Sequence, residues 1–174
     1  MTTRDTLTRY GLVSRLLHWS MALLFLIQFA KFFDRIDDGE HWLGELIGPI
    51  HGSVGGLIML LALVRIGWAL SQRERPPQQG PTAVLASIGH KLLYLLMVAM
   101  PATGSAYVVG NGYGLKLFCV QLIERSGVET PWLITLGEWH SPLAWLTLLT
   151  VVGHVGAALL HHFVFKDDTL RRMA

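Results

Sequence analysis

The chain has 174 residues, a length that suits one domain. Hydrophobic residues make up 52% of the chain and charged residues only 15%, against about 25% charged in soluble domains. This composition excludes an ordinary soluble protein and indicates an integral membrane protein. With a net charge of only +2, we expect membrane lipid, and no nucleic acid, among its partners.

Four apolar stretches are long enough to cross a bilayer as helices, at about residues 12–33, 49–70, 82–109 and 141–165. The first follows several arginines, as in a signal peptide, but it is too long for one and has no small-residue cleavage site before Lys31. We therefore expect this helix to be retained. The sequence predicts an all-α fold, a four-helix transmembrane bundle that forms a single domain over residues 1–174.

Local signals predict where the first helices end and begin. A turn-rich acidic stretch, residues 34–45, follows the first span. Pro49 is well placed as the first residue of the second helix. Residues 72–81 are charged and rich in proline, so they are expected outside the membrane. Thr82 is expected to cap the third helix, and Pro101 predicts a kink in it.

The connection between the third and fourth spans, residues 110–139, is the longest in the chain. Its half-apolar segment, residues 115–123, is expected on the membrane surface. Two starts for the fourth helix stay open: the Thr-Pro pair at 130–131 with a bend at Pro142, or the Ser-Pro pair at 141–142. Both starts leave His140 near the outer end of that helix.

Lysine and arginine counts near the span ends predict the orientation, because these residues are enriched on the cytoplasmic side. The segments on the side of the termini hold Arg4, Arg9, Arg15, Arg65, Arg73, Arg75, Lys91, Lys166, Arg171 and Arg172, whereas the other loops hold Lys31, Arg35, Lys116 and Arg125. This bias places both termini in the cytoplasm and residues 110–139 on the outside, which is the periplasm in a Gram-negative cell. In a bacterium we would therefore expect a multi-pass protein of the inner (plasma) membrane.

Four histidines lie in or beside the predicted spans: His18, His51, His140 and His154. His140 and His154 are just under four helical turns apart, so their side chains face the same way about 21 Å from each other. The topology puts His18 at the inner level with His154, and His51 at the outer level with His140. An ionisable side chain inside a span is costly, so each pair is expected to bind a partner.

Two neutral imidazoles from opposite helices are the standard axial ligands of a low-spin haem b, which carries electrons. The single cysteine, Cys119, excludes a cysteine-built metal site, and no Cys-x-x-Cys-His motif is present for covalent attachment. A lone histidine in a span is more often a hydrogen-bonded linker, and structural zinc needs about four ligands at one level. Pairing by depth therefore predicts two non-covalent haem b groups, with the four histidines as iron ligands.

Residues beside these histidines support that interpretation. Several glycines leave room for a flat macrocycle near the backbone; they are Gly52, Gly55, Gly56, Gly153 and Gly156. Arg65, fourteen residues after His51, is expected at the inner level, where its guanidinium could pair with a haem propionate. His90 is interpreted either as an interfacial hydrogen-bonding residue or as a propionate or quinone contact. His161 and His162 are interpreted as interfacial residues or as members of a proton path to quinone.

The motifs around these histidines resemble the bacterial cytochrome b561 family over nearly the whole chain. They are residues 15–19 (RLLHW), 50–55 (IHGSVG), 89–96 (GHKLLYLL), 138–140 (EWH), 153–154 (GH), 160–163 (LHHF) and 166–170 (KDDTL). The resemblance implies a four-helix membrane bundle with one haem b on each side. It is greatest to members of the family that oxidise superoxide and reduce ubiquinone to ubiquinol.

That resemblance implies an oxidoreductase of the superoxide:quinone type, with ubiquinone and superoxide or another periplasmic one-electron donor as partners. Because superoxide is an anion, a site that collects it needs positive charge, and Lys116 in the long loop is the candidate residue. The alternative is a cytochrome b subunit that relays electrons from a partner dehydrogenase or hydrogenase to quinone.

Overall fold

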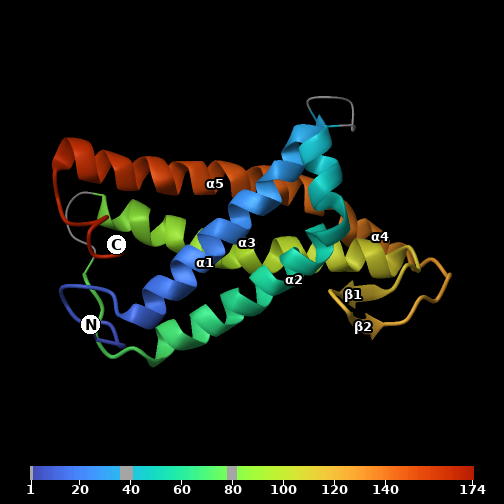
Figure 1. The fold of residues 1–174 in the computed structure, drawn as a ribbon, viewed down its shortest axis with the longest axis horizontal. Coiled ribbons are helices and arrows are strands. Elements are labelled where there is room, and N and C mark those ends of the chain that lie inside the picture. Colours follow the sequence, from blue (N-terminus) through green and yellow to red (C-terminus); the bar gives the residue numbers. More distant parts are fainter. Residues whose placement is uncertain (1, 36–40, 78–81) are drawn as a thin grey trace.

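Four long helices dominate the computed structural model of the protein (Figure 1), and the structure describes all residues except 1, 36–40 and 78–81. The elements in chain order are α1 (Leu12–Phe29), η1 (Ala30–Arg35), α2 (Trp42–Ser71), α3 (Ala83–Gly110), β1 (Leu115–Leu117), β2 (Val120–Ile123), α4 (Pro131–Glu138), α5 (His140–Leu160) and η2 (His161–Phe165). The candidate membrane spans are Leu12–Asp34, Trp42–Ser71, Ala83–Gly110 and Pro131–Phe165. The predicted four-helix membrane bundle is confirmed, although part of the acidic stretch at 34–45 lies outside the described residues.

The two ends of the bundle differ in what they carry. Both chain termini lie at one end, as four spans require, whereas the strands and α4 lie at the other (Figure 1). We call these the inner and the outer end. Helix α3 packs against α2, α4 and α5, and α1 packs against α2.

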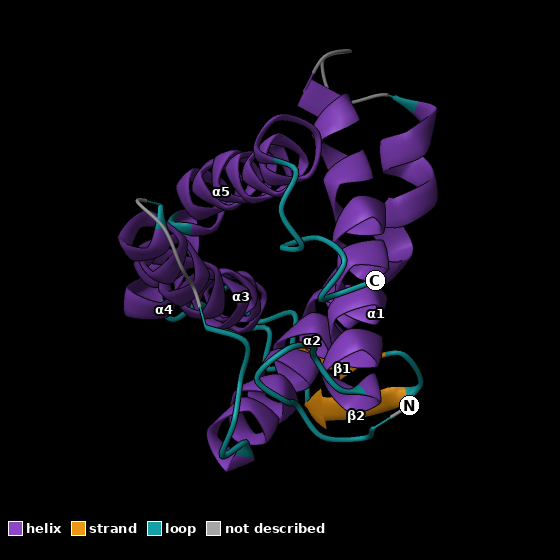
Figure 2. Cartoon of the chain, turned by 90° about the vertical axis from the view of Figure 1, so that its left-hand side faces the viewer, coloured by secondary structure: helices purple, strands orange, loops and turns teal. Residues whose placement is uncertain are grey.

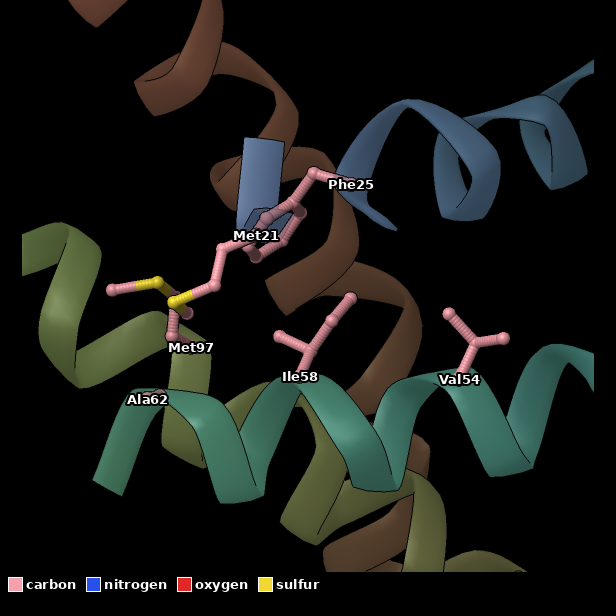
Figure 3. Packing of buried hydrophobic residues seen from close by; sticks show 6 residues of the cluster. All are labelled: Met21, Phe25, Val54, Ile58, Ala62 and Met97. Atoms are coloured by element: carbon pink, nitrogen blue, oxygen red, sulfur yellow. The ribbon is translucent and has the colours of Figure 1, made fainter. Parts of the chain in front are cut away.

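The packed core lies between the first three helices (Figure 3). Its six buried side chains come from one face of each helix and are Met21 and Phe25 of α1, Val54, Ile58 and Ala62 of α2, and Met97 of α3. The three from α2 are four residues apart, which places them on one side of a helix. Helix α5 contributes less, since Thr147 is the single fully buried residue that the structure describes in it. The core therefore fixes α1 to α3 as a frame against which α5 lies.

Helix α2 begins earlier than the sequence indicated. Its first residue is Trp42, so the prediction that Pro49 starts the helix is wrong, and Pro49 lies inside it. The cap is His41, whose Nδ1 accepts a hydrogen bond from the Leu43 N–H at 3.2 Å. Figure 1 shows that the first turns of α2 run across the direction of the rest of the helix. Because proline removes one helical hydrogen bond, Pro49 is a physical reason for this bend.

The fourth span uses both of the predicted start signals. Pro131 is the first residue of α4, after Thr130, and α5 starts at His140, one residue before the predicted 141. Trp139 joins the two helices and keeps helical dihedral angles, φ −67° and ψ −12°. Pro142 lies in the first turn of α5, where proline is tolerated. His140 therefore opens the long helix at the outer end.

Residues 115–123, expected as a half-apolar segment on the membrane surface, form an antiparallel hairpin. Leu115 pairs with Ile123 and Leu117 with Val120, with an irregularity after Leu115. The Phe118 N–H donates to Ser53 Oγ of α2 at 2.7 Å. We call residues 115–123 the outer hairpin, and its contacts with α2 hold it beside the outer end of the bundle.

Candidate haem sites

The inner histidine pair joins the first and the last long helix. His18 of α1 and His154 of α5 have ring centres 6.1 Å apart, with the ring planes at 66°. Both side chains are half-buried between helices. The two residues are separated by most of the chain, and the bundle brings them to one level as the sequence predicted.

The outer pair repeats this arrangement at the other end of α5. His51 of α2 and His140, the first residue of α5, have ring centres 6.0 Å apart. His140 and His154 belong to the same helix, so the two pairs are separated by about 21 Å along its axis. The structure therefore contains two imidazole pairs of nearly equal separation, one towards each end of the bundle.

The separation of the rings fits a shared metal ion. Two imidazoles that bind one iron from opposite sides need ring centres about 6 Å apart, because each metal–nitrogen bond is about 2 Å long and each nitrogen lies roughly 1 Å from its ring centre. In the part of the chain that the structure describes, no group of three or more His, Cys, Asp or Glu residues is arranged to hold a metal ion. The histidine pairs thus suit a cofactor that brings its own equatorial ligands, as a porphyrin does.

The outer pair has a backbone partner that sets the chemistry of one ring. His140 Nδ1 lies 2.9 Å from the Met100 carbonyl oxygen. A carbonyl oxygen only accepts hydrogen bonds, so His140 Nδ1 carries the proton, and Nε2 of the neutral ring keeps its lone pair. Gly104, one turn along α3, leaves room for this ring, because a Cβ there would lie 2.9 Å from His140 Nδ1. His140 is therefore oriented as a metal-binding histidine usually is.

The inner pair contacts a cation instead. Arg65 Nη1 lies 3.1 Å from His18 Nδ1, and the Arg65 guanidinium also lies 5.7 Å from the centre of the Tyr94 ring. The structure thus places Arg65 at the inner level, where the sequence expected it. A guanidinium can only donate hydrogen bonds, so His18 Nδ1 is an acceptor in this arrangement.

A third histidine lies at the inner level. The ring of His90, on α3, is 5.3 Å from the ring of His154, closer than the ring of His18. The sequence left His90 open between an interfacial role and a cofactor or quinone contact. Its position beside His154 makes it a neighbour of the inner site.

The glycines near the histidines divide into two groups. A Cβ added to Gly52, Gly153 or Gly156 would meet no heavy atom within 4 Å, so these positions leave open space. At Gly56, by contrast, a Cβ would lie 2.6 Å from Leu117 Cδ2 of the outer hairpin. The expectation that Gly56 makes room for a macrocycle is therefore wrong, because this glycine makes room for the hairpin.

Lys116 is exposed on the outer hairpin, away from the histidines. The hairpin rests on Ser53 and Gly56, which lie about 200° and 140° around α2 from His51. Lys116 is therefore on the opposite side of α2 from the imidazole of His51. Another basic residue at the outer end, Lys31, is neutralised by an ion pair with Asp34.

The C-terminal tail closes the inner end of the bundle. Figure 2 shows residues after η2 lying across the space between the helices. His161 Nδ1 contacts Asp167 Oδ2 at 2.5 Å, and this hydrogen bond lowers the pKa of Asp167 to about 2. The Trp19 indole N–H donates to the Met173 carbonyl oxygen at 3.0 Å. The tail thus covers the side of the inner pair that faces the chain termini.

The hydrogen-bond partners of the paired histidines leave little or no signal in the sequence. The Met100 carbonyl is a backbone atom and leaves no signature in the sequence. Gly104 follows Pro101 in α3, and a small residue three positions after a proline is a weak signal that could have suggested close approach of another side chain. Gln28 of α1, which donates to the His51 carbonyl oxygen at 2.9 Å, was visible as a polar residue in an apolar span.

Known proteins resemble this chain over most of its length. The model of a family described as prokaryotic cytochrome b561 matches residues 9–174. Cytochrome b561 homolog 2 of Escherichia coli (strain K12) is 31% identical over an alignment of 185 positions, which covers 99% of this chain and 95% of the relative. A Yersinia pestis protein named probable superoxide oxidase CybB is 31% identical over 173 residues, 95% of each chain. Cytochrome b561 homolog 1 of E. coli is 32% identical over 100 residues, 56% of each chain.

The fold, the paired imidazoles and these similarities agree. A cytochrome b561-type protein is a membrane electron carrier, and its type implies haem b, which suits two rings about 6 Å apart. With a family model that spans residues 9–174, the chain belongs to the prokaryotic cytochrome b561 family.

Proposed function

We propose that this protein carries electrons through two haem b groups from superoxide, produced on the periplasmic side, to ubiquinone in the membrane. The observation that carries the proposal is the presence of two imidazole pairs in one helix bundle. Their ring centres are 6.1 Å apart at one level and 6.0 Å apart at the other. The relative named probable superoxide oxidase CybB, aligned over 95% of both chains, supports superoxide as the donor. Both termini are proposed to lie in the cytoplasm.

The four histidines would hold the haems, His18 with His154 at the inner level and His51 with His140 at the outer level. Six-coordinate haem b supplies one-electron transfer and leaves no position at which iron could bind oxygen. The protein's part is to hold the rings rigidly and to exclude water between the levels. The core side chains Met21, Ile58 and Met97, all buried between α1, α2 and α3, serve that second purpose.

The overall reaction balances without another reactant. Two superoxide ions each lose one electron and leave as dioxygen. One ubiquinone takes up these two electrons and two protons and becomes ubiquinol. Because the chain supplies electrons one at a time and the quinone needs two, the protein must act twice for each ubiquinol formed.

Arg65 is proposed to exchange partners when the inner site is filled. Its guanidinium now donates to His18 Nδ1, whereas a neutral His18 that binds iron through Nε2 carries a proton on Nδ1. Two N–H groups cannot donate to each other, so Arg65 must leave His18. A haem propionate is the anion that suits a guanidinium at this level, since charge-assisted pairs of this kind are strong.

Lys116 is proposed to attract superoxide by its field rather than by contact. It is exposed on the outer hairpin, and Lys31 is already paired with Asp34. Charges in water act over about 8 Å at physiological ionic strength, so this contribution is sensitive to salt. Lys116→Gln should lower the rate of haem reduction by superoxide at low salt and have little effect at high salt.

The direct test uses the purified chain in liposomes that contain ubiquinone. An enzymatic source of superoxide is added and the haem absorption bands are followed. We expect haem reduction by superoxide, which superoxide dismutase prevents, followed by formation of ubiquinol. Haem that dithionite reduces but superoxide does not would favour an electron-transfer subunit that needs a partner dehydrogenase or hydrogenase. A protein purified without haem would contradict the proposal.

A further inference from the structure

Gln28 is a buried polar residue inside a membrane span. The residue is 5% exposed, and it lies near the end of α1, which ends at Phe29. A polar side chain in this environment is costly unless its hydrogen-bonding atoms are paired. The position of Gln28 therefore calls for a reason beyond packing.

The contact of Gln28 is with a proposed haem ligand. Gln28 Nε2 donates to the backbone carbonyl oxygen of His51 at 2.9 Å. The contact depends on Gly55, one turn further along α2, because a Cβ there would lie 3.2 Å from Gln28 Nε2. His51 follows Pro49 by two residues, so this contact ties α1 to α2 just after the bend.

The same two residues each have a buried polar atom without a partner. Within the part of the chain that the structure describes, these include Gln28 Oε1 and His51 Nδ1. One is an acceptor, and the other is a donor when His51 binds iron through Nε2. A histidine that binds a metal almost always donates its other ring N–H to an oxygen atom, and His140 already does so to Met100. His51 lacks the equivalent partner.

We propose that Gln28 is the positioning residue of the outer haem ligand His51. Its Nε2 holds the backbone of His51, and its Oε1 accepts the Nδ1 proton of His51 when Nε2 binds iron. This inference rests on the proposed function, because it requires His51 to be a haem ligand.

A plain structural role makes a different prediction. If Gln28 only links α1 to α2, its loss lowers the stability of the bundle and treats both haems alike. If it orients His51, its loss acts on the outer haem. The hydrogen bond to Nδ1 makes the imidazole a stronger donor to iron, which favours the oxidised state, so its removal should raise the outer reduction potential.

The experiment compares three variants of the full-length chain. Gln28→Met keeps the length of the side chain and removes both polar atoms, and Gln28→Glu keeps an acceptor. Thr147→Val is the control: it removes a buried hydroxyl that bonds within α5. Haem content, a redox titration and the low-spin electron paramagnetic resonance spectrum are measured for each. The component of the redox titration and of the spectrum that is absent from His51→Ala identifies the outer haem.

For Gln28→Met we expect outer haem binding to weaken by about 10- to 100-fold, the size usual for partners of metal-binding histidines. The remaining outer haem should have a higher potential and a shifted low-spin signal, while the inner haem is unchanged. Gln28→Glu should retain the outer haem with an equal or lower potential. If Gln28→Met does not fold, the potential of Gln28→Glu alone tests the inference. Thr147→Val should change neither haem.

Equal effects on both haems, or unchanged potentials and spectra in both Gln28 variants, would overturn the inference. Neither result would affect the proposed function if the unaltered protein holds two haems. An unaltered protein with fewer than two haems would instead contradict the proposed function itself.

Discussion

The outer and inner histidine pairs have nearly the same ring separation but opposite surroundings. At the outer pair, His140 Nδ1 donates to the Met100 carbonyl oxygen. At the inner pair, His18 Nδ1 accepts from Arg65. The first contact leaves Nε2 ready to bind iron, and the second places the proton of a neutral ring on the wrong nitrogen. For the proposed haems, His140 is therefore prearranged to bind iron, whereas His18 needs a rearrangement.

The difference indicates how one bundle could hold two similar cofactors in different electrostatic fields. The inner level carries the fixed positive charge of Arg65 and a further imidazole, His90. At the outer level the nearby cation, Lys31, is paired with Asp34. A positive charge favours reduced haem, so we expect the inner haem to have the higher potential. Electrons from the outer end would then move inwards downhill.

The largest effects are expected from removal of the ligands themselves. His140→Ala should leave one haem per chain, that of the inner level, and His154→Ala should leave the outer one. If each pair holds a single iron, as proposed, the double variants His51→Ala with His140→Ala, and His18→Ala with His154→Ala, should each lose no more than one haem. Haem per chain is measured from the pyridine haemochrome spectrum.

His90 supplies the sharpest control for the pairing, because its ring is closer to His154 than the ring of His18 is. His90→Ala should keep two haems, as should His162→Ala near the end of the last span. If His90→Ala lost the inner haem while His18→Ala retained it, the inner pair would be His90 with His154. Retention of two haems in all four ligand variants would contradict the whole assignment.

A smaller effect is expected from Arg65, whose charge should alter the reduction potential of the inner haem and not that of the outer haem. Arg65→Gln removes the inner cation, so the inner haem should bind about 10- to 100-fold more weakly and the inner potential should fall. Arg65→Lys keeps the charge without the planar pair of donors and should restore most of the potential. A redox titration of both variants measures the shift, and the outer haem serves as the internal reference. Equal shifts of both potentials would mean that Arg65 does not distinguish the levels.

Gly104 leaves space beside His140, and filling that space tests whether the orientation of His140 matters for the outer haem. Gly104→Ala would place a Cβ 2.9 Å from His140 Nδ1, and crowding of this kind typically costs about 1 to 3 kcal/mol. We expect partial loss of the outer haem and a lower melting temperature. Gly67→Ala is the matched control on α2, since a Cβ there meets no heavy atom within 4 Å. A Gly104→Ala protein with an unchanged outer haem would show that His140 can move freely.

The sequence predicted the features that depend on periodicity. Long apolar runs predicted four spans, and steps of fourteen residues brought His140 and His154 to one face of α5 and Arg65 to the level of His18. These steps are multiples of the helical repeat, so a long straight helix preserves them.

Features that depend on contacts between distant segments were not predictable in this way. Pro49 suits a first helical position, but His41 caps α2 earlier and the helix continues through the proline. The outer hairpin depends on Ser53 and Gly56 of α2, which no local pattern in residues 115–123 reveals. The acceptor for His140 is a backbone carbonyl, which every residue possesses.

The smallest expected effect concerns the tail, which covers the inner pair and contacts Trp19 beside it. The pKa of Asp167 is lowered from 3.8 to about 2, first by its hydrogen bond with His161. Since the folded pKa is below the ordinary one, the carboxylate stabilises the tail fully above pH 4 or so, and this contribution is lost as the pH falls towards about 2.

Asp167→Asn should therefore loosen the tail at neutral pH and abolish the change in tail stability between these pH values. Hydrogen exchange of the tail amides, corrected for intrinsic rates, measures this. Asp168→Asn is the control, because the Asp168 carboxylate pairs with Arg171, at 3.5 Å, rather than with His161. Haem content should stay at two in both variants, because the tail covers the inner pair without supplying a ligand to it.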